Sequence, residues 1–255
     1  MNSILKVSNI FFSYNKAPLL SNCSFELNRN SITALLGCNG HGKTTLMNCI
    51  MKYLNISSGC IKIDNYDIAN ISIKELSQKI SYVPQINEYS SSCVIRDFLV
   101  EGRTPYLSAF TIPSQKDYEL VDIAAKSYGI YKLLDKKLDE VSGGEKQLVF
   151  IVRALIQNTP FIMMDEPMSA LDLSNQKHVL NILEELKKEG KTILFSTHNP
   201  NHALFLNCNC LVLKNGLILR EGPASTVLDQ DIIKELYGDS IGITNLNNKK
   251  ICYFN

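Results

Sequence analysis

The segment that most constrains the fold is a glycine-rich stretch that lies between a predicted strand and a predicted helix. Residues 37–44 read GCNGHGKT and match the pattern GxxxxGK[ST] of a phosphate-binding loop. The apolar run Ile32–Leu36 predicts a buried strand before the loop, and apolar residues over 46–54 recur on one helix face after it. Backbone N–H groups and the helix dipole then point toward phosphates, and Lys43 adds a charge near the β- and γ-phosphates. The loop therefore predicts a nucleotide site, with the Thr44 hydroxyl as a ligand for Mg²⁺.

The rest of the chain alternates between strand and helix patterns. Runs rich in β-branched and aromatic residues predict N-terminal strands at Ile4–Val7, Ile10–Phe12, Cys23–Leu27, Ile32–Leu36 and Cys60–Ile63. Beyond Pro160, the predicted elements are strands at Phe161–Met164, Thr192–Ser196 and Cys210–Leu213 and a helix over about Ser174–Lys188. Such alternation is typical of an α/β fold, here a P-loop NTPase (RecA-like) core with a mixed, mostly parallel sheet and helices on its faces.

We expect a single domain, residues 1–255, that contains two smaller parts. The early strands predict an N-terminal antiparallel β subdomain, which together with the nucleotide-binding core would occupy residues 1–87 and 159–255. Between these ranges, residues 88–158 carry helical patterns separated by proline and glycine, and they predict an inserted α-helical subdomain. Near the C-terminus, the polar stretch NLNNKK predicts a hairpin turn before ICYFN.

Two acidic residues follow the predicted strand Phe161–Met164. Asp165 is placed like the carboxylate that holds Mg²⁺ in P-loop NTPases, and Glu166 is a candidate to orient and deprotonate an attacking water. The strand Thr192–Ser196 leads into His198, and ligands of α/β proteins bind at such strand ends. We therefore expect His198 to donate a hydrogen bond to the γ-phosphate.

The other three histidines are predicted to lie outside the chemistry. His178 and His202 do not close a strand, so we interpret both as solvated side chains. His41 lies within the phosphate-binding loop, at a position where the backbone N–H is useful whatever the side chain is. Its ring is therefore assigned no role.

Composition narrows the classes of partner and compartment. A net charge of +1 and a pI of about 7.5 give no general basic surface, so we expect no nucleic-acid partner. No apolar run approaches the roughly 20 residues of a membrane-spanning helix, and the N-terminus lacks a signal-peptide pattern, so a cytoplasmic protein is expected. The eight cysteines lack zinc-ligand spacing and are predicted to be reduced.

A second glycine-rich stretch, VSGGEKQ at residues 141–147, precedes an amphipathic helix whose apolar residues recur at i, i+3, i+4, i+7 and i+8 from residue 148. Ser142 lies where its hydroxyl can cap this helix, and Gly143 and Gly144 let a phosphate approach the backbone closely. Because the N-terminus of a helix binds anions, these three residues are compatible with a second anion site, and equally with a plain N-cap followed by two spare glycines.

With these motifs in this order, the chain resembles the ATP-binding cassette (ABC) ATPases over nearly its whole length. VSGGEKQ is similar to the LSGGQ signature of that family, with Val141 for the usual leucine and Glu145 for the glutamine. SYVPQ, which ends at Gln85, resembles the Q-loop, and SALD at residues 169–172 resembles the D-loop.

Three single positions bear on the same resemblance. His198 matches the switch histidine of the family, and Tyr14 matches the aromatic residue that stacks on adenine. Met168 departs from the family, where threonine usually follows the sequence DEP. That position has no catalytic role in the family, so the departure changes none of the expectations.

The resemblance implies an ATP-hydrolysing enzyme that uses ATP and Mg²⁺ and works as a homodimer, in which each ATP lies between one P-loop and the partner's signature. The signature would belong to the helical subdomain. Catalytic roles are implied for Glu166, His198 and Gln85, and Mg²⁺ contacts for Thr44, Gln85 and Asp165. Together with the loop motif, the resemblance gives the nucleotide-binding residues Tyr14, Gly37, Asn39, Gly40, Gly42, Lys43, Thr44, Thr45, Ser142, Gly143 and Gly144.

Two longer segments favour one branch of the family. EGRTPYLSAF at residues 101–110 and FSTHNPNHAL at 195–204 resemble the ATPases of importers for iron-siderophore, haem, cobalamin and molybdate-type ligands. This resemblance implies a subunit at the cytoplasmic face of the cell membrane, held there by a separate integral membrane permease and linked through it to a binding protein. The segment from Gln85 to about Tyr106 would receive the permease.

Some alternatives stay open at this point. The apolar side formed by Ile95, Phe98 and Leu99 is compatible with a docking surface or with simple packing inside the helical subdomain. A soluble ABC ATPase in an assembly process such as iron–sulphur cluster biogenesis, or the ATPase of an exporter, would share every nucleotide motif. A translation factor with two cassettes is disfavoured, because this chain has one P-loop and one signature. The transported ligand would be selected by the permease and binding protein.

Overall fold

The computed structural model describes residues 3–15, 17–85, 91–108, 111–169, 171–247 and 249–254. Its central sheet has six strands in the order β10-β9-β3-β8-β7-β6. Neighbouring strands are parallel, except that β10 pairs antiparallel with β9. The strands are β3 (Ile32–Leu36), β6 (Ile80–Val83), β7 (Phe161–Met164), β8 (Thr192–Thr197), β9 (Asn209–Lys214) and β10 (Leu217–Pro223). This sheet confirms the predicted α/β fold.

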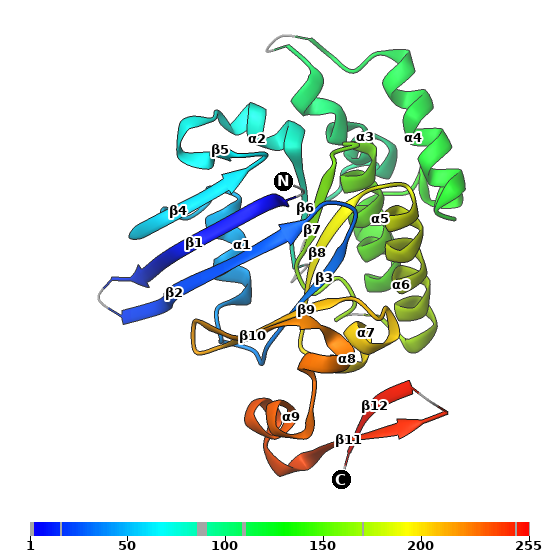
Figure 1. The fold of residues 1–255 in the computed structure, drawn as a ribbon. Coiled ribbons are helices and arrows are strands. Elements are labelled where there is room, and N and C mark those ends of the chain that lie inside the picture. Colours follow the sequence, from blue (N-terminus) through cyan, green and yellow to red (C-terminus); the bar gives the residue numbers. More distant parts are fainter. Residues whose placement is uncertain are drawn as a thin grey trace.

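A second, antiparallel sheet lies beside the central one, with the order β2-β1-β4-β5 (Figure 1). Its strands are β1 (Ser3–Tyr14), β2 (Ala17–Asn28), β4 (Ser58–Ile63) and β5 (Tyr66–Asp67). The predicted runs Ile4–Val7 and Ile10–Phe12 belong to the single strand β1, because a register shift between them absorbs Asn9, whose φ is 49°. The sheet confirms the predicted antiparallel β subdomain.

Side chains that alternate along the central strands divide the core into two clusters. On one face, Ile162 and Phe195 belong to a cluster that includes the helical part of the chain. On the other face, Met163 and Leu194 pack with the β subdomain and with α1 (Lys43–Ile50). Because both faces are covered, the inner strands are mostly apolar, and polar side chains such as Ser196 and Thr197 gather at the end of β8.

Most of the helical part lies on one side of the central sheet, at the right in Figure 1. Within residues 88–158 it contains α3 (Ile95–Val100), the 3₁₀ helix η2 (Glu101–Tyr106), α4 (Gln115–Ser127), two further 3₁₀ turns at Tyr131–Leu133 and Leu138–Glu140, and α5 (Gly143–Ile156). The side of α3 formed by Ile95, Phe98 and Leu99 is buried, and the Phe98 ring lies 4.8 Å from that of Phe150 on α5. This apolar side therefore packs inside the helical part and offers no docking surface.

The remaining elements complete the core and form a C-terminal extension. They are the 3₁₀ helix Ile68–Asn70, α2 (Ile73–Lys79), α6 (Leu173–Lys188), α7 (Pro200–Phe205), α8 (Ala224–Val227), α9 (Gln230–Tyr237), a 3₁₀ turn at Gly238–Ser240, β11 (Ile241–Leu246) and β12 (Lys249–Phe254). β11 and β12 pair antiparallel, which confirms the predicted C-terminal hairpin. Of the described residues, none belongs to a helix that is long and apolar enough to cross a membrane.

Candidate active site

The phosphate-binding loop connects β3 to α1, as the sequence predicts. At its start, a Cβ on Gly37 would lie 2.4 Å from the carbonyl oxygen of Leu213, so only glycine lets β9 approach this closely. At its end, Gly42 caps α1 with a φ of 100°, in the left-handed region. The buried Lys43 Nζ donates to the carbonyl oxygens of Gly37 (2.7 Å) and Cys38 (3.3 Å), which holds the ammonium group over the loop.

A cavity of about 370 Å³ opens over this loop. It is lined by Leu19, Asn39, Gly40, Gly42, Lys43, Thr44, Thr45, Gln85 and Glu166. Most of the candidate residues for the phosphates and Mg²⁺ therefore share one space, although Gln85 and Glu166 are far from the loop in sequence. Leu19 was not predicted, and its place on β2 gives no sequence signal beyond that of an ordinary strand residue. Gly37 is buried behind the lining.

The two acids follow β7 and have different surroundings. Asp165 is fully buried, and its Oδ1 accepts a hydrogen bond from Ser196 Oγ at the end of β8. Its Oδ2 is also buried but has no hydrogen-bond partner within the described parts of the chain. A buried carboxylate oxygen without a partner is costly unless a cation or donor is supplied. Asp165 therefore fits the predicted Mg²⁺ contact, together with the oxygen-bearing side chains of Thr44 and Gln85 in the cavity lining.

Glu166 lies between two cationic or potentially cationic groups. Its Oε1 is 3.1 Å from Lys43 Nζ, and its Oε2 is 3.0 Å from His198 Nδ1. Burial acts to raise the pKa of Glu166, but the hydrogen bond with His198 and the charge of Lys43 outweigh it and hold the pKa below its ordinary value. The residue also has a φ of 48°, which is uncommon for a residue other than glycine and typical of functional sites. An ionised, constrained carboxylate of this kind can accept a proton.

His198 follows the last residue of β8 and is held on both sides. Its ring contacts Glu166, and its carbonyl oxygen accepts a hydrogen bond of 2.6 Å from the Tyr237 hydroxyl at the end of α9. The hydrogen bond with Glu166 raises the pKa of His198, although burial opposes this. The imidazole side chain is 51% exposed, so it can still reach a ligand over the cavity.

Ser196 is a site residue that the sequence did not single out. Its Oγ donates to Asp165 and accepts the backbone N–H of Glu166 at 2.8 Å. One fully buried hydroxyl thus fixes both candidate acids relative to β8. A lone polar residue at the end of the apolar run Thr192–Ser196 was the available signal, and it was read only as part of the strand.

Other predicted nucleotide residues are not in this cavity lining. Tyr14 is 51% exposed at the end of β1, with its ring edge-on to Phe12 at 4.8 Å. Ser142, Gly143 and Gly144 stand at the N-terminus of α5, where Ser142 Oγ accepts the N–H of Glu145 at 3.3 Å. Their predicted roles therefore depend on where the nucleotide base and a second chain would lie.

Of the three histidines predicted to lie outside the chemistry, His178 and His202 differ in exposure. His178 is exposed on α6, in line with a solvated side chain, but the same prediction for His202 is wrong because only 8% of this residue is exposed. Burial, followed by the nearby charge of His198, lowers the pKa of His202 to about 4. His41 accepts the Asn215 N–H at 3.4 Å through its Nδ1, and its lack of a chemical role stays a prediction.

Some of the predicted segments lie partly outside the described residues. Ala170 of the predicted D-loop is one of these positions. The others are Met1, Asn2 and Lys16 of the predicted range 1–87, residues 86–90 of the predicted permease-binding segment, 109–110 at the end of EGRTPYLSAF, Asn248 of the hairpin turn and Asn255.

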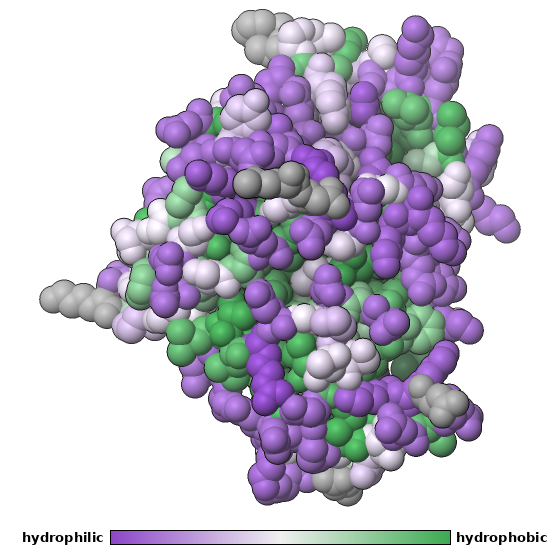
Figure 2. All heavy atoms as spheres, viewed as in Figure 1, coloured by the Kyte–Doolittle hydropathy of each residue, from purple (hydrophilic) through white to green (hydrophobic). Residues whose placement is uncertain are grey.

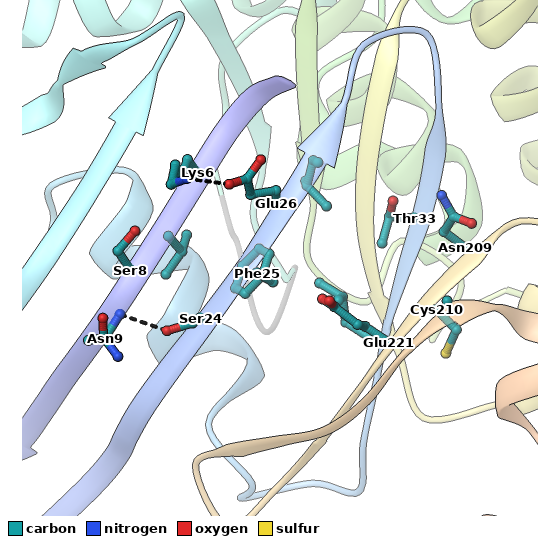
Figure 3. Close-up of a pocket in the computed structure, with 14 residues that line it drawn as sticks. Lys6, Ser8, Asn9, Ser24, Phe25, Glu26, Thr33, Asn209, Cys210 and Glu221 are labelled. Carbon is teal, nitrogen blue, oxygen red and sulfur yellow. Dashed lines mark hydrogen bonds and ion pairs between the residues drawn. The ribbon is translucent and has the colours of Figure 1, made fainter. Parts of the chain in front are cut away.

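A separate cavity of about 630 Å³ lies between the two sheets, with walls from β1, β2, β3, β9 and β10 (Figure 3). On the face of the molecule that Figure 1 and Figure 2 show, apolar side chains gather across the middle, and the rest of the face is mostly polar. Lys6 pairs with Glu26 at 2.5 Å, and the Asn9 N–H donates to Ser24 Oγ at 2.8 Å. None of the predicted site residues lines it, and two of its polar pairs bond each other, so the smaller cavity over the loop is the better candidate for the active site.

Comparison with known proteins agrees with this geometry. The family model described as ABC transporter matches residues 20–169. The chain belongs to the ABC transporter ATPase family. An ABC transporter ATP-binding protein of Methanocaldococcus jannaschii is 36% identical over 95% of this chain and 94% of its own length. The petrobactin import ATP-binding protein of Bacillus subtilis is 31% identical over 97% and 98%, respectively.

A solved structure extends this likeness to the whole fold. An inward-facing ABC transporter of metal-chelate type has a chain that superposes with a TM-score of 0.85 and 28% identity, covering 100% of this chain and 97% of that one. The chain is therefore an ABC ATPase that binds and hydrolyses ATP, which confirms the family resemblance, the fold and the enzyme class expected from the sequence.

Proposed function

We propose that this ABC ATPase is the ATP-hydrolysing subunit of an importer, in which ATP-driven closure of a homodimer moves a metal chelate through a separate permease. The observation that carries the catalytic part is the cluster of Lys43, Glu166 and His198 beside the phosphate-binding loop. The importer part is supported by the petrobactin-import relative and by the metal-chelate type transporter of the same fold.

In this mechanism the loop N–H groups and Lys43 bind the β- and γ-phosphates. Glu166 accepts a proton from the attacking water, and His198 donates toward the γ-phosphate and keeps Glu166 ionised through their contact. Thr44, Gln85 and Asp165 would hold Mg²⁺, which supplies positive charge against the phosphates when it is bound. Tyr14 would stack on the adenine.

The homodimer is proposed from the signature helix. A Cβ on Gly143 would meet no atom within 4 Å in the described structure, so packing within this chain does not explain the glycine. A phosphate held by the P-loop of a second copy would explain it, because glycine lets a phosphate approach the backbone at a helix N-terminus closely. The signature would then act on the partner's nucleotide.

A groove of about 910 Å³ is the proposed permease site. It runs between α2 and β6 on the core and residues 101–108 and 111–113 with α5 on the helical part. Exposed apolar side chains lie along it, with Tyr53 61%, Ile73 57% and Ile112 82% exposed. A groove of this kind suits a short amphipathic helix from a membrane subunit. It would place the ATPase at the cytoplasmic face of the membrane, with the binding protein reached only through the permease.

The catalytic proposal is tested with Glu166→Gln. The variant should bind ATP, form an ATP-dependent dimer in light scattering, and hydrolyse ATP about 10²- to 10⁴-fold more slowly, because it lacks the base. Glu185→Gln, at an exposed position on α6, is the control and should behave as the wild type. Wild-type turnover in Glu166→Gln would remove Glu166 from this role.

The transport proposal is tested by purifying the tagged chain from detergent-solubilised membranes of its own cells. A polytopic membrane protein should copurify with it, and Ile73→Arg in the groove should abolish that association while leaving ATP hydrolysis by the isolated chain unchanged. Recovery with soluble assembly proteins alone would favour the iron–sulphur assembly alternative. Uptake of radiolabelled iron chelates by cells with and without the gene then tests the substrate class and the direction of transport.

A further inference from the structure

The buried residue His202 forms part of a polar chain that the catalytic mechanism does not use. His202 lies on α7, one turn after His198. Its Nδ1 is 2.9 Å from Thr197 Oγ1, and its Nε2 is 3.3 Å from Gln176 Oε1 on α6. The side chain therefore bridges the end of β8 to a helix that begins after the loop following Glu166.

The neighbouring groups offer partners to both ring nitrogens. Thr197 Oγ1 accepts the backbone N–H of Asn199 at 3.0 Å, and its own O–H is free to donate to His202 Nδ1. In the tautomer with the proton on Nε2, His202 donates to the Gln176 carbonyl oxygen, and Asn199 Nδ2 lies 3.4 Å from the same nitrogen. A neutral imidazole is the form that can do both, in line with the lowered pKa of His202.

Gln176 continues the chain into the loop that follows Glu166. Its Nε2 is 3.0 Å from the carbonyl oxygen of Leu171 and 3.4 Å from that of Met168. The same loop returns to Glu166 through Ser169, whose N–H and Oγ both lie about 3 Å from the Glu166 carbonyl oxygen. Hydrogen bonds thus run without interruption from the loop after Glu166 to the turn that carries His198.

We propose that His202 and Gln176 are positioning residues for ATP hydrolysis, which tie the loop after Glu166 to the His198 turn and so hold the Glu166–His198 contact at 3.0 Å. Neither residue lines the cavity over the phosphate-binding loop. The inference rests on the proposed roles of Glu166 and His198, and it adds two residues that act through them.

The polar character of His202 and Gln176 argues against a role in packing alone. An apolar side chain of similar size would fill the same volume without the requirement that every buried polar group find its partner. A fully satisfied buried chain instead specifies one relative placement of its ends. For Glu166 and His198 that placement matters, because a displacement of about 1 Å at a reacting group costs up to about a hundredfold in rate.

His202→Phe and Gln176→Met test the proposal, because each keeps the approximate volume and removes the hydrogen bonds. Each variant should lower kcat by about tenfold to a hundredfold, with ATP affinity in equilibrium binding and the melting temperature close to those of the wild type. The double variant should be no slower than the slower single variant, because the loss of either residue already interrupts the series of hydrogen bonds. His178→Gln, at an exposed position on the same helix as Gln176, should have wild-type kcat.

Two milder variants keep the test decisive if His202→Phe does not fold. His202→Asn retains a polar atom near Nδ1, and His202→Gln retains one near Nε2, so each keeps only one end of the chain. Both should lower kcat with unchanged ATP affinity. Wild-type kcat in any folded His202 variant, or losses that multiply in the double variant, would overturn the proposal. Failure of Glu166→Gln to reduce hydrolysis would instead contradict the role of Glu166 itself.

Discussion

Two helices of this ABC ATPase begin with glycine-rich sequences, but their N-termini have opposite electrostatic character. At α1, Gly42 caps the helix without a side-chain hydrogen bond, the first turn carries no acid, and Lys43 is the first helical residue. At α5, Ser142 and Glu145 form a capping box, in which Glu145 Oε2 accepts both the Ser142 N–H and the Ser142 hydroxyl at 2.8 Å. The first N-terminus has no carboxylate of its own and a lysine that pairs with Glu166 across the cavity, and the second is closed by its own carboxylate.

The difference bears on the order of events that the proposed dimer requires. A phosphate can bind at α1 in a single chain, because donors and a cation are already in place. At α5 an incoming phosphate meets the carboxylate of Glu145, where the family usually has glutamine. The Glu145 side chain must therefore turn away before Ser142 and the glycines can contact a partner's nucleotide. We infer that the signature binds the nucleotide more weakly than the P-loop does, and only after the Glu145 side chain has moved.

The largest effect on ATP binding by the isolated chain should come from the N-terminus of α1. Lys43→Met should weaken ATP binding by the isolated chain by about tenfold to a hundredfold, because a hydrogen bond to a charged group contributes about 1.5–3 kcal/mol and 1.4 kcal/mol is tenfold. Titration calorimetry with a slowly hydrolysed ATP analogue measures this. Lys146→Met, a lysine near the start of α5, is the matched control and should leave this affinity unchanged. Equal losses in the two variants would erase the distinction between the helices.

The second effect should separate binding from hydrolysis. Ser142→Arg places a bulky side chain at the N-terminus of α5, so the partner's phosphate cannot approach. We expect hydrolysis to fall by about a hundredfold or more, as when an oriented donor is lost from an active site, while ATP affinity of the dilute monomer stays near normal. Comparing steady-state turnover with the same calorimetric titration tests this. A matching loss of monomer affinity would contradict action on a partner's nucleotide.

Local patterns explain which parts of this structure the sequence predicts well. The strand Ile32–Leu36 has the observed bounds, and the helix expected over Ser174–Lys188 begins one residue earlier. Residues 37–44 form the loop that their pattern predicts, since glycine, lysine and threonine spacing encodes the local backbone. The capping box of α5 was equally local, because serine followed three residues later by glutamate is its signature, but only the serine was used.

What the sequence could not supply depends on side chains that meet across elements. In the sequence, His202 lies among polar residues at the start of a helix, which suggests an exposed side chain. It is buried because α6 packs beside it, and Gln176 of α6 becomes its hydrogen-bond partner. Ser196 gains its role because β7 and β8 are neighbours, which brings Asp165 within reach. The apolar side of α3 similarly found its partner in α5, which a single helical pattern cannot identify.

The third effect should appear when the carboxylate at α5 is neutralised. Glu145→Gln keeps the geometry of the capping box but removes a negative charge from the path of the phosphate. Two unit charges 4 Å apart in water repel by about 1 kcal/mol, so turnover at limiting ATP should rise by about fivefold or less. The measurement is steady-state hydrolysis over a range of protein concentrations, because the gain should depend on dimer formation.

A matched control exists at another helix of the same chain. Glu75 caps α2 with the same bonds to Ser72, each 2.7 Å long, and it is not part of the nucleotide site. Glu75→Gln should reproduce any effect of the substitution on capping but leave hydrolysis at the wild-type rate. A rise in turnover with Glu75→Gln would mean that the gain in Glu145→Gln does not come from the signature.

The smallest effect should be in the pH dependence of the free energy of unfolding. The N-terminus of α5 should affect it at acid pH, and the site beside α1 should affect it above neutral pH. Backbone and hydroxyl bonds from Ser142 lower the pKa of Glu145. Its contribution to stability is therefore present above the ordinary carboxyl pKa of about 4.3 and is lost as the pH falls through the lowered folded pKa. Near α1, the bond with Glu166 raises the pKa of His198. That contribution is complete below about pH 6.5 and is lost as the pH rises through the raised folded pKa.

Urea unfolding between acid and mildly alkaline pH should therefore distinguish the two regions. Glu145→Gln should flatten only the acid side of the stability profile. His198→Gln should flatten the side above neutral pH and also part of the acid side, because Glu166 loses the hydrogen bond that lowers its pKa. Each change should stay below about 1 kcal/mol, the usual limit for ion pairs that solvent can screen, and the His198 side chain is 51% exposed. If Glu145→Gln also flattens the side above neutral pH, the carboxylate cap and the histidine are not independent, and the contrast between the two helix N-termini fails at its last test.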